Sequence, residues 1–136
     1  MPVIRRVAVG FDGSVEARRA LSWAASLCHS VDASLRVVHV VGLLEEAHLT
    51  PGPSFTPAEI HSLASDAGLP PDRVELSFID GSPADVLLRL TADPDVGAID
   101  LLVLGSRGAG RKPGSVLGST SLEVAERARV PVVVVP

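Results

Sequence analysis

The sequence predicts one α/β domain, built on an open, doubly wound sheet of five parallel strands in the order 3-2-1-4-5, with helices on both faces. Short apolar runs rich in β-branched residues alternate along the 136-residue chain with stretches whose apolar residues recur at helical spacing. This alternation is typical of a parallel sheet covered by helices. Apolar residues make up 46 % of the chain, which is enough for a compact core. No linker or internal repeat interrupts the pattern, so residues 1–136 are assigned to one domain.

The first part of the chain predicts two strands and the helix between them. The strands are expected at Val7–Phe11 and Ser34–Val41, which are both short apolar runs. Ser14 is the expected N-cap of the helix, because a serine hydroxyl accepts a hydrogen bond from a first-turn N–H group. One face of this helix carries the small and apolar residues Ala17, Leu21, Ala24, Ala25 and Cys28.

A proline-rich crossover follows the second strand. Residues 42–57 contain three prolines and two glycines, which predicts an irregular segment. Thr56 and Glu59 have the spacing of a capping box, with Pro57 in the first turn, so a helix is expected to begin there and to end at Gly68.

The rest of the chain continues the alternation. Strands are expected at Arg73–Ile79, Ile99–Gly105 and Val130–Pro136. One further helix opens at the sequence "SPAD", residues 82–85, and the last is expected at Ser119–Ala128.

Composition and charge argue against several functional classes. The net charge of −4 does not favour a general nucleic-acid surface, and the 3 % of aromatic residues, without tyrosine, do not favour a base-stacking platform. The single cysteine, Cys28, excludes an internal disulfide and a cysteine metal cluster. Apolar runs fall far short of the roughly 18 residues needed to cross a bilayer, and the N-terminus has no signal-peptide pattern. We therefore expect a cytoplasmic protein with neither a membrane nor a nucleic acid as partner.

Two loops with unusual chemistry follow strands that should be neighbours. The first is "GFDGS", which contains Asp12, and the second is the glycine-rich stretch from Gly105 to Thr120. Open α/β sheets bind ligands at the carboxyl ends of their strands, where the strand order reverses. The two loops are expected to face one crevice there.

The glycine-rich stretch matches neither of the two common phosphate-binding patterns. Gly105 and Gly110 have the spacing of a P-loop, but Arg111 and Lys112 follow where lysine and serine or threonine are required. A dinucleotide fingerprint beginning at Gly108 is interrupted by a proline.

The remaining pattern is Gly105-x-x-Gly108, nine residues, then Gly118-Ser119 at the start of a helix. Glycines let backbone N–H groups approach an anion, and a helix N-terminus favours negative charge. A surface loop that ends in an ordinary helix cap is the alternative explanation.

This spacing is similar to the ATP-binding motif of the universal stress protein family. The resemblance extends over nearly the whole chain and implies a Rossmann-like fold. "VAVGFDGSVEARRAL" resembles the first strand, turn and helix of the family, "LRVVHVV" its second strand and "IDLLVLGSRG" the approach to the motif. "GSPADVLL" resembles the entry of its third helix, and "GSTSLEVAERARVPVVVV" its closing helix and strand.

The resemblance implies a role for particular residues. Asp12 would lie by the nucleoside, the backbone of Val40 would contact the adenine edge, and Leu104 would line the ribose. The phosphates would be bound by Gly105, Gly108, Gly118, Ser119 and Thr120, and Arg107, Arg111 and Lys112 are further possible phosphate contacts. The resemblance also implies ATP as the ligand, with Mg²⁺ bridging its phosphates, and a homodimer formed through the last strand, Val132 to Val135. An exposed edge strand of four valines needs covering in any case.

The functional expectation is a nucleotide-dependent regulator of a stress response that acts on an unknown protein partner. Two alternatives stay open: a slow ATPase or phosphotransfer enzyme using the same pocket, and a nucleotide-free dimeric interaction module. AMP or a cyclic nucleotide could take the place of ATP. No catalytic residue and no protein metal ligand are assigned. Asp12 could instead brace its own turn, and His39 is expected to be a hydrogen-bonded core histidine rather than a catalytic base.

Overall fold

A computed structural model of the chain describes residues 3–41, 55–95, 98–106 and 118–136, and it confirms the predicted fold class. The sheet is entirely parallel, with the strand order β3-β2-β1-β4-β5. The strands are β1 (Arg6–Gly10), β2 (Ser34–Val41), β3 (Val74–Asp80), β4 (Leu101–Gly105) and β5 (Val132–Val135).

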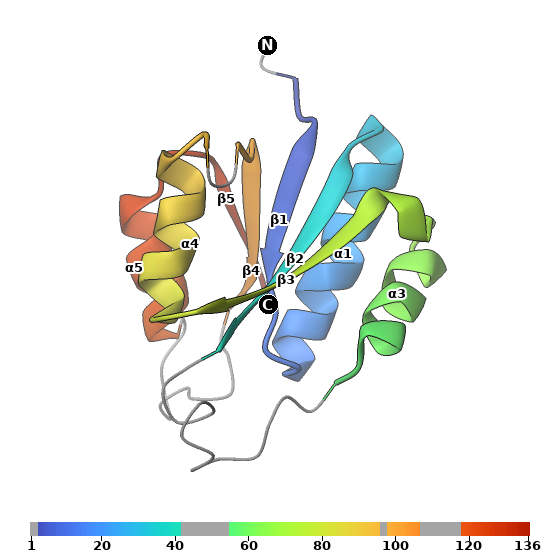
Figure 1. The fold of residues 1–136 in the computed structure, drawn as a ribbon, viewed down its shortest axis with the longest axis horizontal. Coiled ribbons are helices and arrows are strands. Elements are labelled where there is room, and N and C mark those ends of the chain that lie inside the picture. The colour runs from blue at the N-terminus through green and yellow to red at the C-terminus, as the bar shows by residue number, and fades with distance from the viewer. Residues whose placement is uncertain (1–2, 42–54, 96–97, 107–117) are drawn as a thin grey trace.

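Helices cover both faces of the sheet, as Figure 1 shows. α1 and α3 lie on one face and α4 and α5 on the opposite face. Among the described residues, no helix is both long enough and apolar enough to cross a membrane. The helices are α1 (Val15–Val31), α3 (Pro57–Asp66), α4 (Pro83–Ala92) and α5 (Ser119–Arg127), together with the short 3-10 helix η1 (Pro71–Arg73).

The helices α1 and α3 begin at the caps that the sequence predicts. The Ser14 hydroxyl accepts a hydrogen bond from the Ala17 N–H at 3.1 Å, and the Thr56 hydroxyl accepts one from the Glu59 N–H at 3.2 Å. Each cap satisfies one of the N–H groups that an α-helix leaves unpaired at its start.

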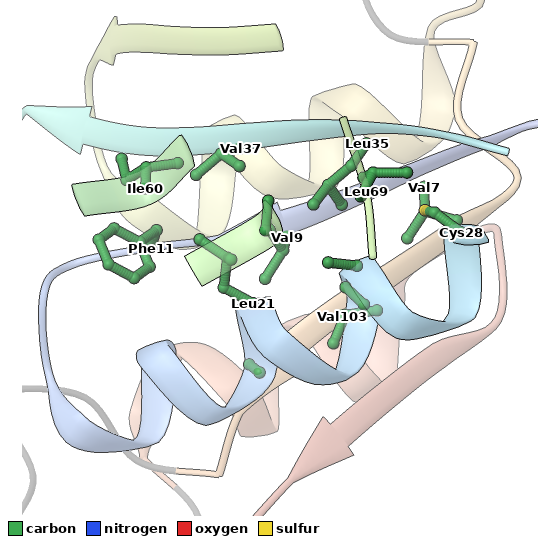
Figure 2. Close-up of a cluster of buried hydrophobic side chains, with 14 of the residues drawn as sticks. Val7, Val9, Phe11, Leu21, Cys28, Leu35, Val37, Ile60, Leu69 and Val103 are labelled. Carbon is green, nitrogen blue, oxygen red and sulfur yellow. The ribbon is translucent and has the colours of Figure 1, made fainter. Parts of the chain in front are cut away.

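The core consists of two apolar layers, one on each face of the sheet. Figure 2 shows the larger layer, in which Val7 and Val9 of β1 face Leu21 and Cys28 of α1. The second layer packs α4 and α5 against the other face of the same strands, with Leu102 of β4 fully buried. Complete burial of one such aliphatic side chain contributes roughly 1.5–3 kcal/mol, so the two layers hold the ends of the strands in fixed positions.

Candidate functional site

The switch point of the sheet lies between the carboxyl ends of β1 and β4. The two strands are adjacent, but the helices that follow them, α1 and α5, lie on opposite faces. A cavity of about 320 Å³ opens at this point. Its walls come from the ends of β1, β2 and β4, the turn before α1, and the first turns of α4 and α5. This volume lies in the range of roughly 300–1,000 Å³ that is typical of small-molecule sites.

The cavity brings together most of the residues singled out from the sequence. Gly108, Arg107, Arg111 and Lys112 lie outside the described residues. The other seven line the cavity from four separate segments of the chain: Asp12, Val40, Leu104, Gly105, Gly118, Ser119 and Thr120.

The turn between β1 and α1 is held by its own side chains. The Asp12 carboxylate accepts a hydrogen bond from the Ser14 N–H at 2.9 Å. Gly13 has a φ of 82°, a left-handed conformation that favours glycine. The Nε of Arg18 donates to the Gly13 carbonyl at 3.1 Å. Asp12 therefore does brace its turn, as the alternative explanation expects, and the same turn presents it to the cavity.

The start of α5 is tied to the end of β4. The Gly118 N–H donates to the Ser106 carbonyl at 2.7 Å, and the Ser121 hydroxyl donates to the Gly105 carbonyl at 2.7 Å. Both Ser106 and Ser121 are buried. These two bonds fix the first turn of α5 at the cavity wall.

The first turn of α5 carries no compensating negative charge. α1, α3 and α4 each have an acidic residue in the first turn, namely Glu16, Glu59 and Asp85, whereas α5 has none. The N–H groups of Ser119 and Thr120 occupy positions that lack partners within a helix. Since the helix dipole favours negative charge at this end, the geometry suits an anionic group of a ligand.

The match to a family model covers almost the whole chain: the model of the universal stress protein family matches residues 4–136. The chain belongs to the universal stress protein family. The predicted family is thereby confirmed.

Among its relatives is a universal stress protein of Mycobacterium tuberculosis, which is 30 % identical over 141 residues. The alignment covers 98 % of the present chain and 48 % of the relative, so the chain spans about half the length of the curated relatives that it matches.

Solved structures of universal stress proteins share the fold. One, determined in complex with cAMP, is 28 % identical with a TM-score of 0.74, and the match covers 99 % of this chain and 98 % of that one. Another, from Archaeoglobus fulgidus in complex with dAMP, has a TM-score of 0.69 over 99 % and 100 % of the two chains. At 20 % identity, this second likeness concerns the fold alone.

Sequence reasoning did not place several of the lining residues at the cavity of this universal stress protein, and His39 is the most polar of them that is buried in a strand. His39 of β2 is 5 % exposed, and its Nδ1 lies 2.9 Å from the Phe11 carbonyl oxygen. The expectation of a buried, hydrogen-bonded histidine is confirmed, but His39 also lines the cavity. The available signal was its position next to Val40, which the family resemblance had already placed at the site.

The described residues hold no group of three histidine, cysteine, aspartate or glutamate side chains that could bind a metal ion. Cys28 is buried in the core, where its thiol donates to the Ser34 carbonyl at 3.6 Å. Burial raises the pKa of this thiol to about 11, and the nearby Arg73 offsets part of the rise. A thiol that stays protonated near neutral pH is a poor nucleophile and metal ligand.

Proposed function

We propose that this universal stress protein binds an adenine nucleotide in the cavity between the carboxyl ends of β1 and β4. The observation that carries the proposal is the convergence of seven residues, singled out from the sequence, on one cavity at the switch point of the sheet. The 28 %-identical universal stress protein in complex with cAMP supports an adenine nucleotide as the ligand class.

The nucleoside would occupy the part of the cavity formed by β1, β2 and β4. Asp12 would lie by the ribose and base, the Val40 backbone would contact the adenine edge, and Leu104 would pack against the ribose. Apolar groups from Val38 and Leu87 complete these walls. A mostly apolar cavity with a few polar groups that fix orientation is typical of ligand sites.

The phosphates would lie at the first turn of α5. Ser119 and Thr120 would donate backbone N–H and hydroxyl groups, at a helix end that has no acidic residue. Gly105 and Gly118 would allow the close approach of phosphate oxygens. The Gly118 N–H already donates to the Ser106 carbonyl. We therefore propose that Gly118 leaves room for a phosphate oxygen but does not donate a hydrogen bond to it. Gly108, Arg107, Arg111 and Lys112 remain proposed phosphate contacts.

We propose ATP with Mg²⁺ as the physiological ligand. Mg²⁺ commonly takes one or two protein groups and completes its shell with phosphate oxygens and water. The side chains at the cavity fit this use, because they offer the Asp12 carboxylate and the Ser119 and Thr120 hydroxyls without a dedicated three-ligand cluster among the described residues. The ion would neutralise phosphate charge.

We further propose that nucleotide occupancy regulates a stress response in the cytoplasm, through a homodimer and an unidentified protein partner. β5 is an edge strand of the sheet, and its four valines are only partly buried within one chain. This geometry favours pairing with a second copy.

The first experiment identifies any small molecule that freshly purified protein releases on denaturation, by chromatography and mass spectrometry. Near-stoichiometric ATP supports the proposal and shows that cleavage is slow, whereas ADP would favour the slow-ATPase alternative. Empty protein is then titrated calorimetrically with Mg-ATP, AMP and cAMP. A protein that binds none of them is not a nucleotide-binding protein, and only the interaction module remains.

Two variants locate the site in the same titration. Gly118→Val places a branched side chain at the phosphate end, and the extended backbone of Gly118, with φ of −70° and ψ of 161°, accepts valine without strain. We expect a loss of ATP affinity of at least tenfold, with circular dichroism unchanged. Asp12→Ala should weaken ATP and cAMP by a similar factor, because both share the nucleoside. Unchanged affinity in both variants would show that the nucleotide binds elsewhere.

A further inference from the structure

His39 lies at the junction between the apolar core and the cavity. Its ring makes edge-to-face contacts with Phe55 and Phe78, with ring centroids 5.0 Å and 5.8 Å away. Phe55 in turn packs edge-on against Phe11 at 4.8 Å. These contacts leave the imidazole little freedom to rotate, so the direction of its Nδ1 is set by packing.

The Phe11 carbonyl receives the hydrogen bond from this ring. Phe11 follows directly after β1, and its N–H still donates to the Val38 carbonyl at 2.8 Å, as a strand residue would. The chain then turns toward α1, and the imidazole Nδ1 reaches the Phe11 carbonyl at 2.9 Å. Because a carbonyl oxygen only accepts, Nδ1 must carry the hydrogen. An unpaired buried carbonyl costs roughly 1–3 kcal/mol, so the bond selects one path for the chain at this point.

The next residue along that path is Asp12. The His39 bond fixes the peptide that joins Phe11 to Asp12, and the Ser14 N–H fixes the Asp12 carboxylate from the other side at 2.9 Å. Asp12 is thus held between the end of β2 and the start of α1, where it lines the cavity.

We propose that His39 is a positioning residue for nucleotide binding, acting through the Phe11 carbonyl to hold Asp12 toward the nucleoside. This inference rests on the proposed function, because it needs an adenine nucleotide in the cavity. It assigns the histidine a role beyond core packing and involves no proton transfer.

Three substitutions separate positioning from packing. The Nδ2 amide of asparagine lies at the same distance along the side chain as the imidazole Nδ1, so His39→Asn retains the donor. The amide of His39→Gln lies one bond farther out, and His39→Leu has no donor. In calorimetric titrations with Mg-ATP and with cAMP, we expect His39→Asn to bind within about threefold of wild type and the other two to bind roughly tenfold more weakly.

A double-mutant cycle with Asp12→Ala tests whether His39 acts through Asp12. The affinity lost in His39→Leu should disappear when Asp12→Ala is already present, because the residue being positioned is gone. If the loss is the same in both backgrounds, or if His39→Asn is as weak as His39→Leu, the inference is overturned. Should His39→Leu fail to fold, the comparison of His39→Asn with His39→Gln still decides. Wild-type protein that binds neither nucleotide would overturn the proposed function, and the inference with it.

Discussion

Gly105 lies so close to the first turn of α1 that it has no room for a side chain. An ideal Cβ at this position would be 2.9 Å from both the carbonyl carbon and the Cβ of Glu16. Since the obstacle includes backbone, it cannot rotate away, and we expect Gly105→Ala to lower the free energy of unfolding by roughly 1–3 kcal/mol. The shift of the urea unfolding midpoint measures this loss.

Gly10→Ala is the matched control for this prediction. Its new Cβ would meet Cδ2 of Leu104 at 2.8 Å, but that atom is the end of a side chain that can change rotamer. The cost should therefore be smaller than for Gly105→Ala. Equal losses in the two variants would mean that the Glu16 backbone is not the cause. A larger loss in Gly105→Ala would show that packing against Glu16 requires glycine at this position, whether or not Gly105 contacts a phosphate.

The sequence predicts the positions and contacts of some side chains but not of others. The Ser14 cap and the buried face of α1 follow from local spacing, and both are confirmed. The place of His39 in the cavity wall depends on the carbonyl of Phe11, the residue directly after the neighbouring strand β1. The contact of Gly105 with Glu16 depends on how β4 packs against α1. Neither contact can be predicted from the residues near it in the sequence.

Secondary-structure elements are predicted well except at some ends. β2 matches its expected bounds, Ser34–Val41. β4 begins at Leu101 rather than at Ile99. The reason is that the carboxylate of Asp100 accepts hydrogen bonds from the N–H groups of Arg5 and Arg6, at 2.8 Å and 2.9 Å. A pattern of apolar runs does not predict a side-chain hydrogen bond between two distant segments, so it does not predict this end of the strand.

The edge strand β5 gives a prediction about assembly. Its valines are partly buried, and Val132, Val133 and Val135 pack against the two core layers. Val134→Lys should therefore disturb the chain itself least while placing a charge on the proposed dimer edge. Light scattering is expected to give twice the 14.1 kDa chain mass for wild type and the single mass for Val134→Lys. A monomeric wild type, or a dimeric variant, would rule out pairing through β5.

The molecule as a whole is expected to lose stability at alkaline pH because of one buried thiol. The pKa of Cys28 is raised by burial from 9.0 to about 11 in the folded protein. Between these values the unfolded chain binds fewer protons than the folded one, so the free energy of unfolding falls as the pH rises. We expect this loss to be on the order of 2 kcal/mol by pH 11.

Urea unfolding between about pH 8 and pH 11 measures this slope, with Cys28→Ala as the control. Few other side chains titrate in this pH window, because the sequence has no tyrosine and Lys112 is its only lysine. Cys28→Ala should be less stable at pH 8, owing to lost packing, but its stability should be nearly flat across the window. Parallel curves for wild type and variant would assign the slope to other groups.

At the scale of the whole molecule, the alternation of strands and helices predicts both the topology and the place of the cavity. A right-handed crossover on each side of β1 leaves few arrangements for five parallel strands, and the observed order is the expected one. The shape of the cavity wall could not be predicted as well, since it arises where five segments distant in sequence meet.

The bond between Gly118 and Ser106 has a consequence for how this protein can evolve. Because the Gly118 N–H donates to the Ser106 carbonyl, the chain enters and leaves residues 107–117 at neighbouring points. A change of length between two such points costs little, since each doubling of the number of residues in a closed segment adds only about 0.6 kcal/mol of closure entropy. Descendants of this chain can thus vary the length and sequence of that segment while inheriting the sheet and its two core layers unaltered.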